Sequence, residues 1–436
     1  MQESSLVITG MGAVTPIGTG TDAYWNSLVS GICGIDTITR FPVDDLPVHI
    51  AAEVKDFDAQ KLIPHSLERN MALFAKYGYV AAREALKDAC LEEVDDPARV
   101  GIVMGTAMDG MSTLAATQAQ LSTGSLHKVG PRLVPMVLGN MTAGILAIDR
   151  GFHGPSITVN TACSSGGDAI MTAAMLLNFG EADAILVVGG ESILSPVLIS
   201  SLAAAKALSR RNDDPKAASR PFDRDRDGFV IGEGGGALVI ETERHAKARG
   251  VTSYATLAGF ANTQDGYHIT APDPHGAGAA KCMHLALERA GLAPSDIGYL
   301  NAHGTSTPMG DKVETLAIDA VFGKSPDHLM VSSTKGATGH MMGAGGITEI
   351  IACIKALQTG ILPPNINYHI PDPDCALNIV ANTACRADIH AAMSNSLGFG
   401  GQNSSIILTR ETGDSPCSIH TTSRLSGKTL NTSTSG

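Results

Sequence analysis

Short apolar runs alternate with longer amphipathic segments along most of the chain. The apolar runs predict β-strands at Ser5–Thr9, Val100–Met104, Ser156–Asn160, Ala184–Val188, Ala237–Glu241, Ile297–Asn301, Leu329–Ser332, Ala392–Ser396 and Ser405–Thr409. The amphipathic segments predict helices at Tyr24–Ser30, Glu68–Ala89, Asp168–Phe179, Ala279–Ala290 and Ile347–Leu357. Strands that alternate with helices in this way are typical of an α/β fold.

Two stretches far apart in the chain have the same local plan. Strand Ser156–Asn160 runs into a sharp turn of small residues and then a helix, and strand Leu329–Ser332 runs into the Gly-rich turn Lys335–Gly346 and then a helix. A fold of two similar halves would bring the two turns together. We therefore divide the chain into residues 1–254, residues 255–411 and a Ser-, Thr- and Gly-rich tail at 412–436, which we expect to be disordered.

Composition and charge exclude several classes of protein. Hydrophobic residues make up 44% of the chain, as in a globular protein, and the net charge of −12 with no basic stripe argues against binding to nucleic acid. No apolar run reaches about 18 residues, so no membrane span is expected. The first residues lack the features of a signal peptide, which favours a cytoplasmic protein.

Among the eight cysteines, none of them spaced as CxxC, only Cys163 has the surroundings of a nucleophile. The segment NTACSSGG at residues 160–167 joins a predicted strand to a predicted helix through small residues. Such a turn exposes the sulfur at a helix N-terminus, which favours the thiolate, and leaves the backbone N–H of Cys163 free to bind an oxyanion. Most cysteines are buried core residues, and Cys385 is assigned to that class because neither small residues nor a long helix follow it.

Two histidines lie in Gly- and Thr-rich loops after predicted strands. His303 stands in NAHGTSTP at residues 301–308, and His340 stands in TKGATGH at residues 334–340. Loops at strand ends carry the reactive groups of α/β folds, and two neutral imidazoles near Cys163 could stabilise an enolate by hydrogen bonds. The alternative is that both are ordinary polar loop residues, and a catalytic zinc is not expected from this spacing.

A lysine and a glycine-rich hairpin complete the candidate site. Lys335, beside a carboxylate such as Asp311, Glu314 or Glu349, would hold the histidines in position, although a surface lysine is an equal alternative. The segment NSLGFGGQN at residues 395–403 would form a hairpin in which Phe399 caps a pocket and gives its N–H to an oxyanion. A plain hairpin turn is the alternative for this segment.

Together these motifs resemble the elongating β-ketoacyl-acyl-carrier-protein synthases, relatives of the polyketide ketosynthases. The resemblance runs from about Ser5 to about Arg410. It rests on TACSSG at Cys163, NAHGTSTPMGD at His303, KGATGH at His340, NSLGFGGQN at Phe399 and PFDRDRDGFVIGEG at residues 221–234.

The resemblance implies a thiolase-like fold, in which two similar halves form five αβαβα layers, usually in a homodimer. The first half would carry the nucleophile and the second both histidines. An acyl group would move from the phosphopantetheine arm of an acyl carrier protein to Cys163. Malonyl-carrier protein would then lose CO₂, and its enolate, held by His303 and His340, would attack the acyl thioester. The backbone N–H groups of Cys163 and Phe399 would bind the oxyanion, with no catalytic cofactor.

The resemblance also assigns binding residues. The positions that match the substrate-binding set are Thr270, Thr305 and Thr307 for the pantetheine arm, Met108 and Leu202 for the acyl pocket, and Gly400. In some relatives a monovalent cation lies near positions that match Asn301, Glu349, Ser394 and Asn395.

The chain departs from the family pattern at several of these places. Leu397 replaces Phe and Gln402 replaces Thr in the common NSFGFGGTN motif, and both changes bear on the Phe399 turn. Met108 stands where relatives have a small or branched residue and Leu202 where they often have Phe, so the acyl chain length is left open. Residues 65–69 carry one certain positive charge where relatives have several. Docking of the carrier would then rely on Lys128, Arg132, Lys206, Arg210 and Arg211.

Three alternatives to fatty-acid elongation remain. A ketosynthase of a dedicated polyketide or polyene pathway would use the same mechanism. A silent chain-length factor would lack the nucleophile that Cys163 supplies. A degradative thiolase would need a second catalytic cysteine in the hairpin where Phe399 stands.

Overall fold

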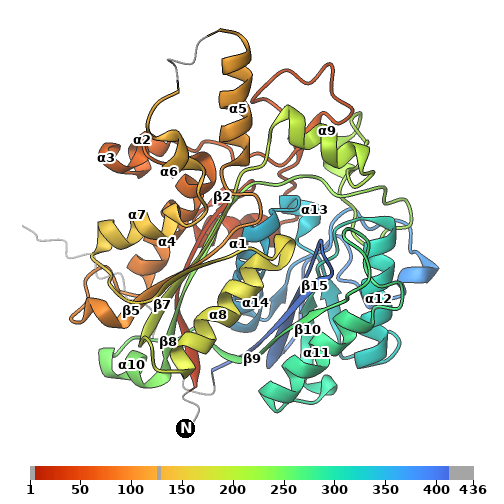
Figure 1. The fold of residues 1–436 in the computed structure, drawn as a ribbon. Helices are drawn as coiled ribbons and strands as arrows, with labels where there is room; N and C mark the ends of the chain where they lie inside the picture. Colours follow the sequence, from red (N-terminus) through yellow and green to blue (C-terminus); the bar gives the residue numbers. More distant parts are fainter. Residues whose placement is uncertain (1–4, 125–128, 412–436) are drawn as a thin grey trace, which may run out of the picture.

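A computed structural model describes residues 5–124 and 129–411 of the chain. Its main feature is a mixed eleven-stranded sheet with the strand order β11-β10-β14-β15-β9-β1-β8-β7-β5-β6, in which β2 pairs with β1 off this path (Figure 1). The strands are β1 (Leu6–Thr15), β2 (Gly18–Thr19), β5 (Val100–Gly105), β6 (Ser156–Val159), β7 (Ala184–Glu191), β8 (Gly234–Thr242), β9 (Ala255–Gln264), β10 (Ile297–Asn301), β11 (Met330–Ser332), β14 (Ala391–Gly398) and β15 (Gln402–Thr409).

The strand pairings of the two sides mirror each other. On one side β6, β5 and β7 are parallel neighbours, and β8 and β1 follow them in antiparallel pairing. On the other side β11, β10 and β14 are parallel neighbours, and β15 and β9 follow in antiparallel pairing. The two sides join where Val7 and Ile8 of β1 pair with Thr256 and Ala255 of β9. The division of the chain at residue 254 stays a prediction, and the predicted tail at 412–436 lies outside the described residues.

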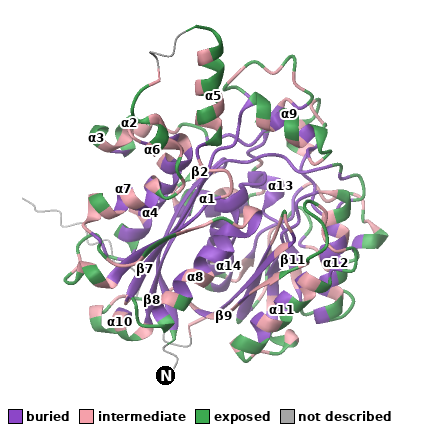
Figure 2. Cartoon of the chain, viewed as in Figure 1, coloured by how far each residue is buried: buried purple, intermediate pink, exposed green. Residues whose placement is uncertain are grey.

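Helices cover and separate the two sides of the sheet (Figure 1). α4 (Leu73–Asp88) and α7 (Met141–Arg150) pack on one outer face around a core cluster that includes Phe74, Tyr77 and Val188. α11 (Ala277–Ala290) and α12 (Pro308–Phe322) cover the opposite outer face. α8 (Ser165–Asn178) and α14 (Met342–Thr359) lie between the two sides, and Figure 2 shows them largely buried. This order gives the five layers that the resemblance implies.

Glycines bring α8 and α14 together at their N-termini. A Cβ atom on Gly166 would lie 2.8 Å from the carbonyl oxygen of Gly343, and one on Gly346 would lie 3.0 Å from the backbone nitrogen of Gly167. A side chain at Gly166 would force the helices apart, because real Cβ atoms essentially never come within 3.0 Å of such an atom, and one at Gly346 would need its neighbour to move by a few tenths of an ångström. This close contact places Cys163, just before α8, beside His340, just before α14.

Most predicted elements agree with the structure, and the exceptions have local causes. The predicted helix Glu68–Ala89 is two helices, α3 (His65–Glu68) and α4, because Ala72 is extended between them. The predicted turn Lys335–Gly346 contains a short helix, α13 (Lys335–Thr338). Strand β9 was missed, since its outer half, Phe260–Gln264, is rich in polar residues. Helix α12 was missed although Thr307 caps it and Pro308 opens it, which are ordinary helix-start signals.

The remaining helices and short strand pairs surround this core. They are α1 (Thr21–Val29), α2 (Ala59–Leu62), α5 (Met111–Ser122), α6 (Leu133–Val137), α9 (Pro196–Ala204), α10 (Glu243–Arg249), and the strand pairs β3 (Asp36–Thr37) with β4 (Ile50–Ala51) and β12 (Ile361–Leu362) with β13 (Cys385–Arg386). Every residue of α5 is exposed or half-buried, and this helix stands out at the top of Figure 2. Within the described residues, no helix is both long and apolar enough to span a membrane.

Candidate active site

Cys163 lies in a tight turn between β6 and α8, as the small residues around it predict. The backbone of Ala162 adopts φ 53°, in the left-handed region, and a single 3₁₀ turn, Ala162–Ser164, then leads into α8. The carboxylate of Asp168 accepts hydrogen bonds from the hydroxyls of Thr161 (2.5 Å) and Ser164 (2.9 Å). These bonds hold the chain on both sides of Cys163. Sequence reasoning missed Asp168, although an acidic residue in the first turn of a helix is a recognisable signal.

The thiol of Cys163 is more deeply buried than its place at a helix start suggested. Burial raises its pKa to about 11, although hydrogen bonds with the backbone of Phe399 and of Cys163 itself and the charge of Lys335 lower it. The expected preference for thiolate is therefore overturned by desolvation, which the sequence does not reveal. The thiol contacts the Sδ atom of Met342 at 3.9 Å.

The raised pKa predicts how the reactivity of Cys163 depends on pH. Only the thiolate reacts with iodoacetamide, and its fraction rises about tenfold per pH unit while the pH stays below the pKa. Since the pKa of Cys163 is about 11, the alkylation rate should still increase between pH 8 and pH 10. Mass spectrometry of the labelled peptide measures this rate. A plateau near pH 7 would contradict the neutral resting thiol.

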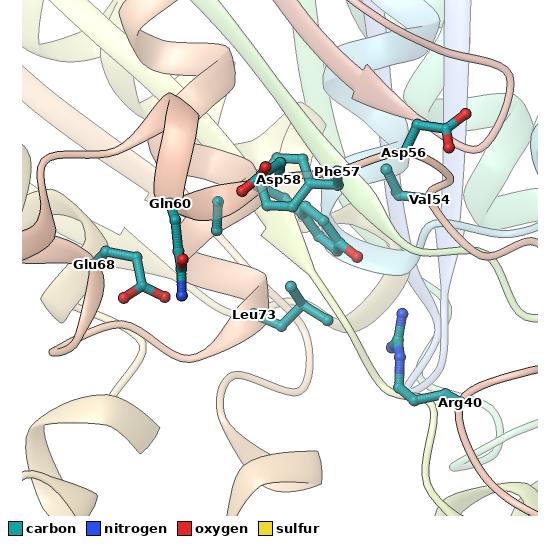
Figure 3. A pocket seen from close by; sticks show the side chains of 10 residues that line it. Arg40, Val54, Asp56, Phe57, Asp58, Gln60, Glu68 and Leu73 are labelled. Carbon is teal, nitrogen blue, oxygen red and sulfur yellow. The ribbon is translucent and has the colours of Figure 1, made fainter.

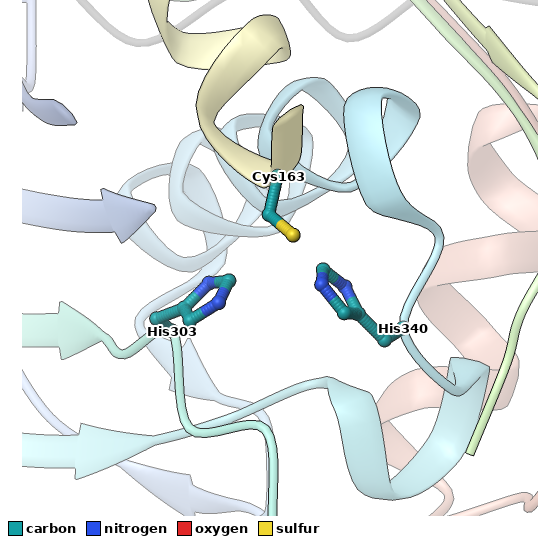
Figure 4. Close-up of side chains that lie close together, drawn as sticks. All are labelled: Cys163, His303 and His340. Atoms are coloured by element: carbon teal, nitrogen blue, oxygen red, sulfur yellow. The ribbon is translucent and has the colours of Figure 1, made fainter. Parts of the chain in front are cut away.

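His303 and His340 flank the sulfur from two other loops. Their ring centroids lie 5.2 Å apart with an interplanar angle of 86°, and Figure 4 shows the Cys163 sulfur directed toward the space between the rings. One ring nitrogen of each histidine and the Cys163 sulfur all lie within 4.8 Å of one another. A structural zinc would usually take a fourth ligand, whereas the described residues offer only these three.

Both imidazoles are neutral and available to donate hydrogen bonds. Burial, and next the positive charge of Lys335, hold the pKa of His303 and of His340 well below the usual range. Both ring nitrogens of His340 and the Nδ1 atom of His303 lack hydrogen-bond partners among the described residues. Because buried polar atoms are rarely left unpaired, these nitrogens mark a place for a polar group of a substrate.

The two predicted carboxylates on α12 hold the His303 loop and do not contact the lysine. Glu314 accepts hydrogen bonds from the backbone N–H groups of His303 and Gly304, both at 2.8 Å, and burial raises its pKa to about 7. Asp311 accepts from the backbone N–H of Phe222 at 2.8 Å and of Ser306 at 3.1 Å, and burial raises its pKa to about 6. Both carboxyl groups therefore act on the backbone around His303.

Of the three possible partners for Lys335, the structure selects Glu349. The two side chains are buried and form an ion pair between α13 and α14. An ammonium group is costly to bury without such a partner. The positive charge of Lys335 lies near Cys163 and both histidines and lowers the pKa of all three. Lys335 is thus an internal residue of the site, and the surface alternative is wrong.

The predicted hairpin joins β14 to β15 and reaches the nucleophile. A Cβ on Gly398 would lie 2.8 Å from the carbonyl oxygen of Thr161, so this strand end approaches the turn that carries Cys163. The backbone of Phe399 lies close enough to the thiol to lower its pKa, while the Phe399 residue is 40% exposed and lines the cavity described next. Gly400 adopts φ 85° and donates its N–H to the carbonyl oxygen of Ile269 at 2.8 Å. The turn is therefore fastened to the neighbouring loop.

A cavity of about 500 Å³ contains Cys163 and both histidines. The structure places five of the predicted binding residues on its walls, namely Met108, Leu202, Thr270, Thr305 and Thr307, but Gly400 is not among the lining residues. The hydroxyl oxygens of Thr305 and Thr307 lie 3.1 Å apart. Sequence reasoning missed Ile193, Phe229 and Met342, which also line the cavity. Phe229 lies within the PFDRDRDGFVIGEG motif, but the sequence gives no sign that Ile193 faces this cavity.

The residues assigned to a cation stand on β10, α14 and β14, and the side chain of Asn395 is already bonded, since its Oδ1 accepts from the hydroxyl of Ser405 at 2.8 Å. Asn301 of β10 is the register partner of Ser394 of β14, and both are buried with Asn395 and Glu349. Neither the oxygen nor the nitrogen of the Asn301 side-chain amide has a partner among the described residues. A buried, unpaired amide oxygen whose register partner carries a hydroxyl offers oxygen ligands of the kind that a hard cation prefers, so Asn301 and Ser394 fit such an ion.

A second, more open hollow of about 770 Å³ lies around Arg40 (Figure 3). Asp56, Asp58 and Glu68 stand on its rim, and its ten lining residues include no cysteine, serine or histidine. The guanidinium of Arg40 forms an ion pair with the buried Glu233. The nucleophile and its flanking histidines thus belong to the smaller cavity.

Comparison with known proteins decides the family. The sequence model for the N-terminal domain of β-ketoacyl synthases matches residues 3–246, and the model for their C-terminal domain matches residues 254–369. The chain belongs to the β-ketoacyl synthase family. This β-ketoacyl synthase is therefore a condensing enzyme of the acyltransferase type, and the predicted thiolase-like α/β fold is confirmed.

Individual relatives of this β-ketoacyl synthase are similar over nearly their full length. It is 44% identical over 410 residues to the 3-oxoacyl-[acyl-carrier-protein] synthase 2 of Staphylococcus aureus, across 94% of this chain and 99% of that protein. The solved ishigamide ketosynthase/chain length factor aligns with a TM-score of 0.87 at 32% identity, across 94% of this chain and all of that one. A type II polyketide ketosynthase solved in complex with its acyl-carrier protein aligns equally well, with a TM-score of 0.87 at 30% identity and the same coverage.

Proposed function

We propose that this β-ketoacyl synthase extends acyl chains in fatty-acid synthesis, by decarboxylative Claisen condensation of an acyl-enzyme with malonyl-acyl carrier protein. The observation that carries the proposal is the convergence of Cys163, His303 and His340 on one cavity. A thiol nucleophile beside two neutral imidazoles suits a reaction that needs both a thioester and a stabilised enolate. The 3-oxoacyl-[acyl-carrier-protein] synthase 2 of Staphylococcus aureus is 44% identical, whereas the solved type II polyketide ketosynthase is 30% identical, which favours fatty-acid elongation.

In the first half-reaction the acyl group moves to the enzyme. The sulfur of Cys163 attacks the thioester carbonyl of the acyl carrier, and a new S–C bond replaces the bond to the pantetheine sulfur. The thiol proton leaves with the pantetheine sulfur, so the carrier departs as a free thiol. The backbone N–H groups of Cys163 and Phe399, which both lower the pKa of the thiol, would bind the oxyanion that forms in between.

In the second half-reaction malonyl-carrier protein enters the same cavity. Its terminal C–C bond breaks, CO₂ leaves, and the electron pair forms an enolate whose oxygen accepts hydrogen bonds from His303 and His340. The enolate carbon attacks the acyl thioester on Cys163, a C–C bond forms, and the C–S bond to Cys163 breaks. The released thiolate takes up a proton from water, which replaces the one that left with the first carrier. The raised pKa of Cys163 favours this return to the thiol.

Mass spectrometry after incubation with a panel of acyl-carrier proteins tests the proposal. We expect a mass increase equal to the acyl group on the peptide that contains Cys163, and formation of β-ketoacyl-carrier protein after malonyl-carrier protein is added. Acylation of another residue, or loading without condensation, would contradict it. A preference for polyketide intermediates over saturated acyl chains would favour the polyketide pathway instead.

The acyl carrier protein, which presents the acyl group on its phosphopantetheine arm, is the proposed partner. Lys206 lines the cavity together with Thr270 and Thr305, so a positive charge lies near the pantetheine path. Lys128, which was assigned to the same docking patch, lies outside the described residues. Carrier proteins are typically acidic, and complementary charge raises the rate of association.

Charge reversal at Lys206 tests this docking. Lys206→Glu should raise the Michaelis constant for carrier-bound substrate about tenfold at low salt, and added salt should reduce the difference, because surface charges are screened over about 10 Å. A short pantetheine thioester should show a much smaller change. Equal losses on both substrates would indicate damage to the cavity rather than to docking.

A monovalent cation and a second copy of the chain are further proposed partners. Asn301, Glu349, Ser394 and Asn395 would hold the cation, which would neutralise charge below the catalytic loops. Potassium or sodium should then raise the melting temperature of the protein, and Asn301→Ala should remove that effect.

The edge strand β6 has a neighbour on one side only among the described residues, and the nearby hydrophobic residues Ile148 and Phe179 are 77% and 67% exposed. Such surfaces are typical of interfaces, so light scattering should give a dimer. The change Ile157→Lys, at a residue of β6 that is 40% exposed, should give a monomer.

The cytoplasm is the proposed location. All seven cysteines of the described residues are free, as expected in a reducing compartment. Cell fractionation that recovers the protein from an oxidising compartment would contradict this proposal.

A further inference from the structure

Glu191, the last residue of β7, is a buried carboxyl group without a role in the reaction described above. Its Oε2 atom accepts hydrogen bonds from the backbone N–H of Ala107 at 2.8 Å and of Gly343 at 3.2 Å. Its Oε1 atom accepts from the backbone N–H of Met108 at 3.2 Å. Three N–H groups from two distant parts of the chain therefore meet on one side chain.

Burial makes this arrangement costly for the protein. It raises the pKa of Glu191 to about 8, although the three backbone N–H groups lower it. An apolar residue at the end of a buried strand would avoid that cost, but it would leave three backbone donors unpaired. The hydrogen bonds of this carboxyl group therefore join two segments of the chain.

The first of these segments is the corner between β5 and α5. Met108 in this corner lines the cavity, and Asp109 after it adopts φ 48°, in the left-handed region that residues other than glycine rarely occupy. The side-chain amide of Asn160 donates to the carbonyl oxygen of Ala107 at 3.1 Å, and Thr106 Oγ1 accepts from the N–H of Asp109 at 3.3 Å. A strained corner of this kind keeps its shape only while its surroundings hold it.

The second segment is the N-terminus of α14. Gly343 follows Met342, whose sulfur touches Cys163, and a Cβ atom on Gly343 would lie 2.7 Å from the backbone nitrogen of Ala107. The corner and the helix therefore touch through their backbones, and Glu191 bonds to both. Met108 and Met342, one on each segment, both line the cavity that holds Cys163.

We propose that Glu191 is a positioning residue that sets the acyl-chain selectivity of the cavity, because it locks the Met108 corner against the N-terminus of α14. This inference rests on the proposed acylation of Cys163 and extends it from the reaction to the choice of substrate. Glu191 touches neither substrate nor nucleophile and acts through the placement of Met108 and Met342.

The change Glu191→Gln tests this positioning role with almost no change in side-chain volume. A glutamine keeps one acceptor oxygen, which can serve Ala107 and Gly343 from the position of Oε2. At pH 9, above the pKa of about 8, Glu191 is mainly a carboxylate that accepts on both oxygens, whereas the glutamine NH₂ group would face the N–H of Met108, donor against donor, so that bond is lost. The variant should therefore release the Met108 corner in particular, and the cavity should admit longer acyl chains.

The measurement is kcat/KM at pH 9 for acyl-carrier proteins from octanoyl to palmitoyl in the full chain. In Glu191→Gln the ratio of palmitoyl to octanoyl activity should rise about tenfold, which lies within the range that a single altered apolar contact produces. Condensation of the best-accepted chain should persist. Glu241→Gln is the matched control, since Glu241 is a fully buried carboxylate on the adjacent strand β8 that bonds to Thr9, His245 and Arg249. It should lower the melting temperature without changing the ratio.

Gly343→Ala is the second variant and leaves the carboxyl group intact. Its Cβ would push the corner away from α14 and should shift the same ratio in the same direction. This variant decides the question if Glu191→Gln does not fold. An unchanged ratio in the folded variants, with only a loss of stability as in Glu241→Gln, would overturn the proposal. An absence of condensation in the unmodified enzyme would instead contradict the proposed function.

Discussion

Replacing Cys163 by alanine should abolish condensation. The loss expected on removal of a nucleophile is on the order of 10⁴- to 10⁶-fold, since no covalent intermediate can then form. The side chain is small and the surrounding turn is held by Asp168, so the variant should fold. The loss of activity is measured as the rate at which β-ketoacyl-carrier protein forms, with chromatography used to quantify the product. Cys163→Ser should be almost as inactive, because the hydroxyl is a far weaker nucleophile in this buried place.

Cys385→Ser provides the control for this experiment. Cys385 shares the preceding residues Asn-Thr-Ala with Cys163 but lies on the short strand β13, away from the cavity that contains the histidines. This variant should keep full activity and should still be acylated at Cys163. Residual acylation of the Cys163→Ala protein at Cys385 would show that the assignment of the nucleophile is wrong.

Loss of either histidine should stop the decarboxylation of malonyl-carrier protein. This step is best observed in a Cys163→Gln background, where the amide imitates the acyl-enzyme carbonyl and decarboxylation proceeds without condensation. Removing one hydrogen-bond donor from an oxyanion costs about 10²- to 10³-fold, so His303→Ala and His340→Ala should each lower CO₂ release by about that factor. Release of labelled CO₂ from malonyl-carrier protein measures the effect.

The pKa of the histidines gives this prediction a second, independent measurement. Burial and Lys335 keep both imidazoles neutral, so CO₂ release should not fall between pH 7 and pH 6, where an ordinary histidine would gain its proton. His284→Ala, on the exposed side of α11, is the matched control and should leave the rate unchanged. If decarboxylation persists in both active-site variants, the enolate is stabilised elsewhere.

The candidate site could be predicted from the sequence where the signal is local. Cys163, His303 and His340 each stand in a short motif beside a predicted strand, and a motif needs only a few neighbouring residues to be recognised. The α/β class and most strands follow from local patterns in the same way. The partner of Lys335 could not be chosen among three carboxylates, because that choice depends on how α13 packs against α14.

What could not be predicted depends on contacts between distant segments. Burial of Cys163 comes from both halves of the chain, so the rise of its pKa is invisible in the residues around it. Glu191 bonds to residues 83, 84 and 152 positions away, and nothing in its own segment distinguishes it from an ordinary strand end. The division of helices at Ala72 is a local feature that the apolar periodicity concealed.

The neutral resting state of Cys163 has a consequence for oxidative stress. Peroxides oxidise thiolates far faster than thiols, and exposed cysteines of low pKa are the ones that become sulfenic acids first. A nucleophile whose pKa is raised to about 11 and whose side chain is buried would be oxidised slowly between catalytic cycles. The burial that slows the attack of small oxidants on the thiol would thus keep the enzyme active for longer in a cell that generates peroxide.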